Sequence, residues 1–232
     1  ETGLLEKVGT YLGGVVHGMF LDVTPEPEPS VIEKAVARFL QGGHDGLVAV
    51  GGGSVIDTAK VVSVYAGLDC DLKDLSAPDS VTAEGFPLVA IPTTAGTGSE
   101  VTNIAVLSDP EAGLKRGIVS DFMLPDIALV SPEMTLTMPP SVTAASGVDA
   151  LVHAVEAYLS KNASPITDGL ALKAIELISN GLATAYREPE NLSAREAMST
   201  GSLMAGMAFG NAGVGAVHAL AYPLGGRFHV AH

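Results

Sequence analysis

Two side chains with metal-binding chemistry lie in one apolar stretch, residues 146–156. Asp149 and His153 are four residues apart, so in a helix of about 3.6 residues per turn they project from the same face. A buried carboxylate needs a proton, a cation or a metal beside it, because removing an unpaired carboxylate from water is costly. The other faces are apolar, as expected of a helix buried on all sides, and carry Val148, Leu151, Val152, Val155, Tyr158 and Leu159.

A simpler interpretation of the same stretch needs no metal. Ser146 could begin the helix as its N-cap, with Asp149 three residues later completing a capping box. His153 would then be an ordinary core histidine with its hydrogen bonds satisfied. The spacing of the two side chains does not decide between these interpretations.

The distribution of the histidines gives a sharper indication. His17 and His44 lie in the first half of the chain, and the other four lie in the second half: His153, His218, His229 and His232. An aspartate with three neutral imidazoles suits Fe²⁺ or Zn²⁺ rather than Mg²⁺ or Ca²⁺. The sequence has no H-E-x-x-H motif and no cysteine pair, which excludes the usual zinc protease and zinc-finger classes.

Two loops in the first half have the composition of anion-binding loops. The glycines at 51–53 follow an apolar strand expected at 47–50 and begin a helix that runs to Tyr65, the order found in phosphate-binding βα units. A glycine turn in any α/β protein is the alternative. The second loop, 93–100, follows a strand expected at 87–91 and carries four hydroxyls, which favours a ligand at the carboxyl ends of parallel strands. Asp57 and Lys60, on the helix that follows the first of these loops, are expected to be only a surface pair.

The elements that must position these residues fall into two halves. Short strands are also expected at 19–23, 103–107, 115–119 and 126–130, with a helix end at 1–14. Capping boxes predict helix starts at Ser30 and Ser193, and a proline after Ser164 predicts another. After residue 140 the chain is alanine-rich with no strand signal. We therefore expect a dinucleotide-binding α/β domain at 1–140 and a helical metal-binding domain at 141–232.

The composition limits the classes of binding partner and the cellular compartment that we expect. The 232 residues carry a formal net charge of -14, and no basic stripe exists to neutralise phosphates, which argues against nucleic acid and anionic membranes. A single cysteine, Cys70, and no signal peptide at Glu1 favour a reducing, cytoplasmic setting. Residues 197–226 carry no charged side chain, but their glycines, Asn211, His218 and Pro223 predict packed helices rather than a membrane span.

Four motifs in order resemble the iron-containing (group III) alcohol dehydrogenases: GGGSVIDTAK at 51–60, IPTTAGTGSEVT at 91–102, GVDALVH at 147–153 and VHALAYPLGG at 217–226. The resemblance implies an α/β N-terminal Rossmann-like domain and an all-α C-terminal domain, the dehydroquinate synthase-like architecture in truncated form. It implies metal ligands at Asp149, His153, His218 and His232. It also implies an NAD or NADP site lined by Gly52, Gly53, Ser54, Asp57, Thr93, Thr94, Thr97, Thr102 and Lys115.

The sequence departs from this family at three places. Many members carry a histidine, assigned to proton transfer, where this chain has Tyr222; His229 is the nearest other relay, so both are catalytic candidates. The first βα unit, which chooses between NAD and NADP, is expected to be missing. Most of the helical domain after His232 is expected to be missing as well.

The resulting hypothesis is a metal-dependent oxidoreductase that transfers a hydride between an alcohol, aldehyde or ketone and NAD(P), with Fe²⁺ or Zn²⁺ as Lewis acid and a homodimer as the expected assembly. A dehydroquinate synthase-like lyase or cyclase is the first alternative. It would need several cations for a phosphorylated substrate, and the helical half offers only Lys161, Lys173, Arg187, Arg195 and Arg227. The second alternative is an incomplete chain that binds cofactor without turnover.

Overall fold

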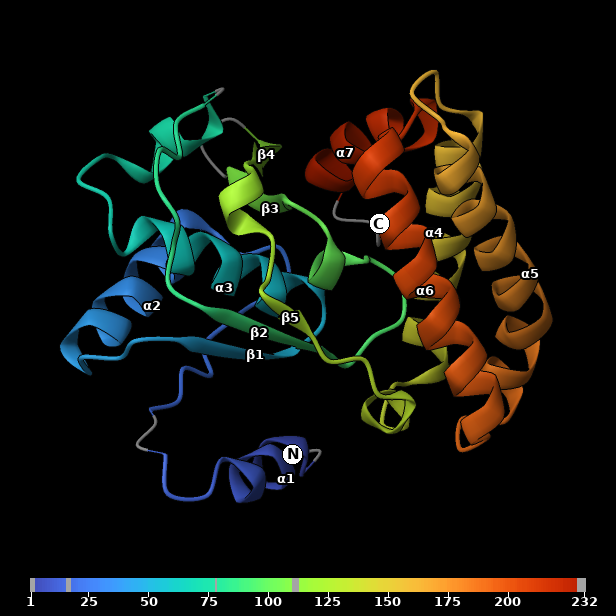
Figure 1. Ribbon diagram of the computed structural model, residues 1–232, viewed down its shortest axis with the longest axis horizontal. Coiled ribbons are helices and arrows are strands. Elements are labelled where there is room, and N and C mark those ends of the chain that lie inside the picture. The colour runs from blue at the N-terminus through green and yellow to red at the C-terminus, as the bar shows by residue number, and fades with distance from the viewer. Residues whose placement is uncertain (1–2, 16–17, 78, 110–112, 229–232) are drawn as a thin grey trace.

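The computed structural model describes residues 3–15, 18–77, 79–109 and 113–228. Figure 1 shows a strand-containing part at the left and a group of long helices at the right. All strands precede residue 130, and the long helices begin at Pro140. The expected change of pattern near residue 140 is therefore present. The division into separate domains at that point stays a prediction.

A parallel sheet brings the two expected loops together. Its order is β1 (Leu47–Gly51), β2 (Leu88–Pro92) and β5 (Ile127–Ala128), and all neighbours are parallel. Gly51 is paired with Pro92, so β1 and β2 end at the same edge, and the Thr93 N–H donates to the Gly51 carbonyl over 2.9 Å. The loops that follow the two strands are therefore neighbours, as the sequence predicted.

Helix α3 (Gly53–Tyr65) lies beside this sheet and an antiparallel hairpin. The hairpin consists of β3 (Ile104–Asp109) and β4 (Leu114–Val119). Helix α2 (Pro29–Gln41) packs on α3, and the core beneath them contains Ile32, Phe39, Val61, Leu75, Ile118 and Met123. Every residue of α3 from Ile56 to Val64 is buried, because sheet, hairpin and α2 cover it from different sides.

Three long helices form the second half. They are α4 (Pro140–Leu159), α5 (Pro165–Arg187) and α6 (Leu192–Ala212), which pack on one another in Figure 1. Their shared core contains Ala150, Ala154, Ala174, Ala185, Ala205, Ile178 and Met198. The alanines let the helices approach closely, which explains the alanine-rich sequence. Helix α7 (Ala216–Phe228) follows and contacts β4, so it returns to the first half.

Some local predictions were wrong. Residues 19–23 form neither strand nor helix, although α1 (Leu4–Leu12) is present. Helix α2 begins at Pro29 without a side-chain cap, since proline's fixed φ and missing N–H suit a first helical position. Helix α6 begins after Asn191, whose side chain accepts from the Ala194 N–H. Ser164 does cap α5, and Pro165 is the first residue of that helix as expected.

Helix α4 is not buried on all sides, contrary to the prediction. Val148, Val155, Tyr158 and Leu159 are exposed, with 73% of the Leu159 surface accessible. Short 3-10 helices at Leu72–Ser76, Ser99–Val101, Asp121–Met123 and Pro132–Thr135 complete the fold. Within the described residues, no helix is long and apolar enough to cross a membrane.

Candidate metal centre and dinucleotide pocket

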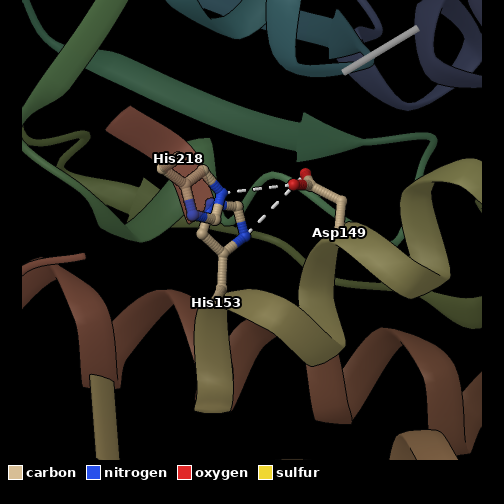
Figure 2. Close-up of side chains that lie close together, drawn as sticks. All are labelled: Asp149, His153 and His218. Carbon is tan, nitrogen blue, oxygen red and sulfur yellow. Dashed lines mark ion pairs between the residues drawn. The ribbon is translucent and has the colours of Figure 1, made fainter. Parts of the chain in front are cut away.

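Asp149, His153 and His218 meet at one point between α4 and α7. Each offers one ligand atom, and these atoms all lie within 4.8 Å of one another. Figure 2 shows both imidazoles turned toward the carboxylate: His218 Nε2 lies 3.4 Å from Asp149 Oδ1, and His153 Nδ1 lies 3.8 Å from Asp149 Oδ2. The i, i+4 spacing on α4 therefore presents two of the side chains together, and α7 brings the third.

The capping-box interpretation of this stretch is wrong. Helix α4 begins six residues before Ser146, at Pro140, because Pro139-Pro140 provides the start. Ser146 is inside the helix, where its hydroxyl donates to the Val142 carbonyl over 2.7 Å. Asp149 consequently caps nothing. Its side chain is only 10% exposed and faces the two imidazoles.

The imidazole of His153 is held in a stack of three rings. Phe209, from α6, stacks on one side with ring centroids 4.2 Å apart, and His218 stacks with the same separation. The interplanar angles are 16° and 15°. His153 is 6% exposed and His218 is 3% exposed. The stack limits rotation of the His153 ring, so packing fixes the orientation of the candidate ligand.

Glu156 is a fourth member of this cluster that the sequence analysis missed. Its Oε2 lies 2.5 Å from His218 Nδ1, and its Oε1 accepts the Val217 N–H over 2.7 Å. A signal was available, since Glu156 lies three residues after His153 and so shares its face of the helix. Burial alone would lower the pKa of His218, but hydrogen bonds to Asp149 and Glu156 raise it overall. Burial raises the pKa of Glu156, whereas its bonds from His218 and backbone N–H groups lower it overall.

A single cavity of about 200 Å³ connects these ligands with the first half of the chain. Of the residues expected to bind the dinucleotide, those lining it are Gly53, Ser54, Asp57, Thr97, Thr102 and Lys115. The lining also includes Asp149, His153 and His218. The described residues Gly52, Thr93 and Thr94 do not line it. A Cβ on Gly52 would lie 3.3 Å from the Thr94 side chain, so these two residues pack on each other.

Asp57 and Lys60 are not the surface pair that we expected. Lys60 is 0% exposed and donates to Thr102 Oγ1 over 3.1 Å and to the Ile104 carbonyl over 3.0 Å. Asp57 accepts the Val106 N–H over 2.9 Å and lies 4.0 Å from the ammonium. Both side chains thus tie α3 to the hairpin. The prediction failed because the hairpin covers the face of α3 that was assumed to be open to solvent.

Burial shifts the pKa values of Asp57, Lys60 and Glu100. It lowers the pKa of Lys60 to about 8, against the opposing attraction of Asp57 and Glu100. Burial also raises the pKa of Asp57 and of Glu100, and Lys60 counteracts both shifts. Asp57 Oδ1 has no hydrogen-bond partner among the described residues, although the side chain lines the cavity. The aspartate therefore has spare acceptor capacity at the cavity wall.

Glycines in the second loop let it touch the helical half. A Cβ on Gly96 would lie 2.6 Å from the Ser146 Cβ of α4. Gly98 has a φ of +61°, and a Cβ there would lie 2.6 Å from the Gly206 Cα of α6. These contacts fix the loop, with Thr97 between them, against both helices. The hydroxyls of this loop stand out in the sequence, whereas the packing role of its glycines does not.

Gly53 and Lys115 have protein partners inside the pocket. A Cβ on Gly53 would lie 2.7 Å from Thr97 Cγ2, so the glycine is required by packing between the loops as well as by any ligand. Lys115 Nζ donates to Glu26 Oε1 over 2.6 Å, which holds the ammonium at the cavity. The two loops and the hairpin therefore form one pre-built wall.

Three predicted site residues lie wholly or partly outside the described part of the chain. His229 and His232 lie outside the described residues, as does the side chain of Tyr222, whose backbone is in α7. The fourth metal ligand and the proton relay therefore stay predictions.

Two family models cover most of the chain. The model described as iron-containing alcohol dehydrogenase matches residues 1–132. The model described as Fe-containing alcohol dehydrogenase family, C-terminal, matches residues 143–232. The two matches are separated by residues 133–142, and each includes two of the four motifs.

Individual relatives agree with the family models. Long-chain-alcohol dehydrogenase 1 of Geobacillus thermodenitrificans (strain NG80-2) is 50% identical, with 100% of this chain and 60% of the relative aligned. NAD-dependent methanol dehydrogenase of Bacillus methanolicus is 39% identical over 100% of this chain and 61% of the relative. This chain therefore spans about 60% of the length of these relatives.

A solved structure has the same fold. The crystal structure of sulfoacetaldehyde reductase from Bifidobacterium kashiwanohense in complex with NAD+ superimposes with a TM-score of 0.95 at 34% identity, covering 100% of this chain and 62% of that chain. The predicted combination of a Rossmann-like α/β part and a helical part is confirmed. The motifs, the matching family models and the shared fold together establish that this chain belongs to the iron-containing alcohol dehydrogenase family.

Proposed function

We propose that this chain is the metal- and dinucleotide-binding part of an oxidoreductase that transfers a hydride between NAD or NADP and an alcohol, aldehyde or ketone. The observation that carries the proposal is the shared cavity: the candidate metal ligands and residues of the glycine loops line it together. The names of two relatives, a long-chain-alcohol dehydrogenase and an NAD-dependent methanol dehydrogenase, support this reaction class. The NAD+ complex of the solved relative supports the cofactor.

In this proposal Asp149, His153 and His218 hold Fe²⁺ or Zn²⁺, with His232 as the fourth ligand. One carboxylate and two imidazoles converging within 4.8 Å fit a borderline divalent ion. Within the described part of the chain, no lysine or arginine forms an ion pair with Asp149, so the buried carboxylate has room for a metal as its counter-charge. When bound, the ion supplies Lewis acidity that lowers the pKa of an alcohol hydroxyl.

The dinucleotide is assigned to the glycine loop and its surroundings. Helix α3 begins at Gly53, and no described side chain caps its N-terminus, which leaves first-turn N–H groups for a pyrophosphate. Thr97 and Thr102 contribute hydroxyls, and the Lys115 ammonium, held by Glu26, lies in the cavity wall. These residues bind and orient the cofactor, so that its nicotinamide meets the substrate near the metal ligands.

Apolar side chains complete the cavity and suit a small alcohol or aldehyde. Its lining includes Ile104, Val106, Phe209 and Val214. Such walls exclude water from the space between cofactor and substrate, which keeps a transferred hydride from reaching solvent. We assign no step to a side-chain nucleophile, because hydride transfer needs none.

The lyase or cyclase alternative has less support. A phosphorylated substrate needs free cations, and Lys115 is the one lysine or arginine in the described cavity lining. It is paired with Glu26. Arg195 is fully buried and donates to Met138, Thr143 and Pro189, so its guanidinium serves packing within the protein and does not line the cavity. The hydride-transfer proposal is therefore preferred.

A cytoplasmic location and a homodimer belong to the same proposal. Cys70, the single cysteine, is free and exposed, which suits a reducing compartment. Sedimentation of the purified chain measures the oligomeric state directly, and a monomer at micromolar concentration would contradict the dimer.

The test is an anaerobic assay of NADH oxidation. The 232-residue chain, and a version extended to the full length of its relatives, are loaded with Fe²⁺ and mixed with short aldehydes. We expect aldehyde-dependent oxidation of NADH in the extended protein that stops when a chelator removes the metal. The shorter chain should bind NADH and Fe²⁺ whether or not it turns over. NADH oxidation that is indifferent to the chelator, or no NADH binding by either protein, would contradict the proposal.

A further inference from the structure

Both carboxylate oxygens of Glu156 contact residues at the start of α7. The residue lies on α4, is 7% exposed, and is not part of the cavity lining. Oε1 accepts the Val217 N–H over 2.7 Å, while Oε2 faces the His218 N–H at 3.4 Å and His218 Nδ1 at 2.5 Å. The side chain thus joins the helix that carries two candidate ligands to the helix that carries the third.

These bonds specify the tautomer of His218. A carboxylate that accepts backbone N–H groups at both oxygens is held in its ionised form, which can accept hydrogen bonds but cannot donate them. The hydrogen shared with the imidazole must therefore sit on Nδ1. The lone pair of the neutral ring is then on Nε2, the nitrogen that faces Asp149 Oδ1 at 3.4 Å.

We propose that Glu156 is a positioning residue for the metal centre: it fixes the ring orientation and Nδ1–H tautomer of His218 and sets the place of α7 against α4. This inference rests on the proposed metal site. Carboxylates that accept from the remote nitrogen of a metal-binding imidazole raise its basicity, and their loss typically costs about 10- to 100-fold in metal affinity. Glu156 would act through His218, without contacting the ion.

The backbone around α7 is shaped to reach this carboxylate. A Cβ on Gly215 would lie 2.9 Å from Glu156 Oε1, so a larger residue would crowd the oxygen that binds Val217. Gly213, with a φ of +80°, turns the chain between α6 and α7. The Ser160 hydroxyl anchors the end of α6 by donating to the Ala212 carbonyl over 2.5 Å. The turn therefore places the backbone N–H groups of Val217 and His218 within hydrogen-bonding distance of Glu156.

A simple capping role makes a different prediction. An acid that only caps α7 would stabilise the metal-free fold and leave the metal affinity of folded protein unchanged. A positioning residue changes the metal affinity of molecules that remain folded. The two roles are separated by measuring both quantities on the same variant.

The experiment compares Glu156→Gln with the wild-type chain. Glutamine has nearly the same shape, but its amide nitrogen cannot accept from His218 or Val217. Zn²⁺ affinity is measured by competition with a chromophoric chelator, and the thermal midpoint is measured without metal. We expect Zn²⁺ binding weaker by about 10- to 100-fold in folded Glu156→Gln. Glu176→Gln, the same change at an exposed residue paired with Lys173 on α5, is the matched control and should bind as the wild type.

A second measurement needs no variant, in case Glu156→Gln fails to fold. In the Zn²⁺-loaded wild-type chain, ¹⁵N NMR should show a protonated Nδ1 on His218 and no proton on Nε2. A protonated Nε2 would overturn the inference, and so would wild-type affinity in Glu156→Gln. If the wild-type chain itself binds no Zn²⁺, the proposed metal site fails instead, and that outcome is distinguished by the wild-type titration.

Discussion

Two buried clusters of charged side chains adjoin the same cavity, and they differ in what compensates the buried carboxylates. Asp57, Lys60 and Glu100 include their own cation, Lys60, which lies 4.0 Å from Asp57. The other cluster joins Asp149 and Glu156 to two imidazoles, and no described lysine or arginine pairs with either acid. The first cluster supplies its own cation, and its side chains tie α3 to the hairpin. The second has acids, ring nitrogens and access to a cavity, which is the composition of a metal site.

The spacing of the residues along the sequence is similar in the two clusters and does not predict this difference. Asp57 and Lys60 are three residues apart on α3, and Asp149 and His153 are four apart on α4. Both spacings place two polar groups on one helix face. What separates them is the chemistry of the second residue. An ammonium neutralises a neighbouring acid and has no lone pair for a metal, whereas a neutral imidazole provides one.

The largest effect is expected from removing the cation of the first cluster. Lys60→Met leaves the buried Asp57 carboxylate, Thr102 hydroxyl and Ile104 carbonyl without their ammonium partner, and breaking a buried pair in this way costs about 3–5 kcal/mol of unfolding free energy at pH 7. Urea unfolding measures the loss. Adding Asp57→Asn should recover part of it, because the Val106 N–H keeps an acceptor while one buried charge disappears. A loss below about 1 kcal/mol would show that Lys60 is not the neutralising charge.

The same lysine predicts how stability depends on pH. Burial holds its pKa in the folded chain at about 8, below the ordinary value of 10.5. Between these values the unfolded chain binds more protons than the folded chain, so the unfolding free energy rises with pH, by roughly 1–3 kcal/mol across the window. Subtracting the curve of Lys60→Met from that of the wild type isolates this contribution. A flat difference between pH 8 and 10.5 would be incompatible with a buried, charged Lys60.

The second loop, which contributes Thr97 to the shared cavity, packs on α6, which contributes Phe209. Gly98→Ala adds a Cβ 2.6 Å from the Gly206 Cα and places it at a φ of +61°, so we expect a loss of about 2 kcal/mol. Gly113→Ala is the matched control, with a φ of +63° and no atom within 4 Å of the added Cβ. It should show only the smaller cost of the positive φ. Equal losses in the two variants would mean that the contact with Gly206 contributes nothing.

The sequence predicted the features that depend on local pattern. The strand, glycine turn and helix at β1 and α3 are present, and so is the parallel pairing that brings the two loops together. Asp149 and His153 could be linked by helical spacing alone. His218 joined them through its chemistry and through the family resemblance, and the structure brings all three within 4.8 Å.

The features that the sequence missed depend on what covers a helix face. Periodicity assigns residues to a helix face. It does not show that the hairpin covers Lys60, or that backbone N–H groups at the start of α7 donate to Glu156. The same limit applies to Gly96 and Gly98, whose role depends on helices about 50 and 110 residues further along the chain. Tertiary contacts of this kind leave no local signature.

The central claim is that the second cluster is a metal site, and the metal content of Asp149→Ala tests it most directly. The wild-type chain and the variant are incubated anaerobically with Fe²⁺ or Zn²⁺, dialysed and measured by elemental analysis, with the metal-free thermal midpoint confirming that both are folded. The carboxylate is the only anion in the proposed ligand set, so we expect about one ion per wild-type chain and almost none in the variant. A folded variant that keeps a full equivalent of metal would contradict the assignment.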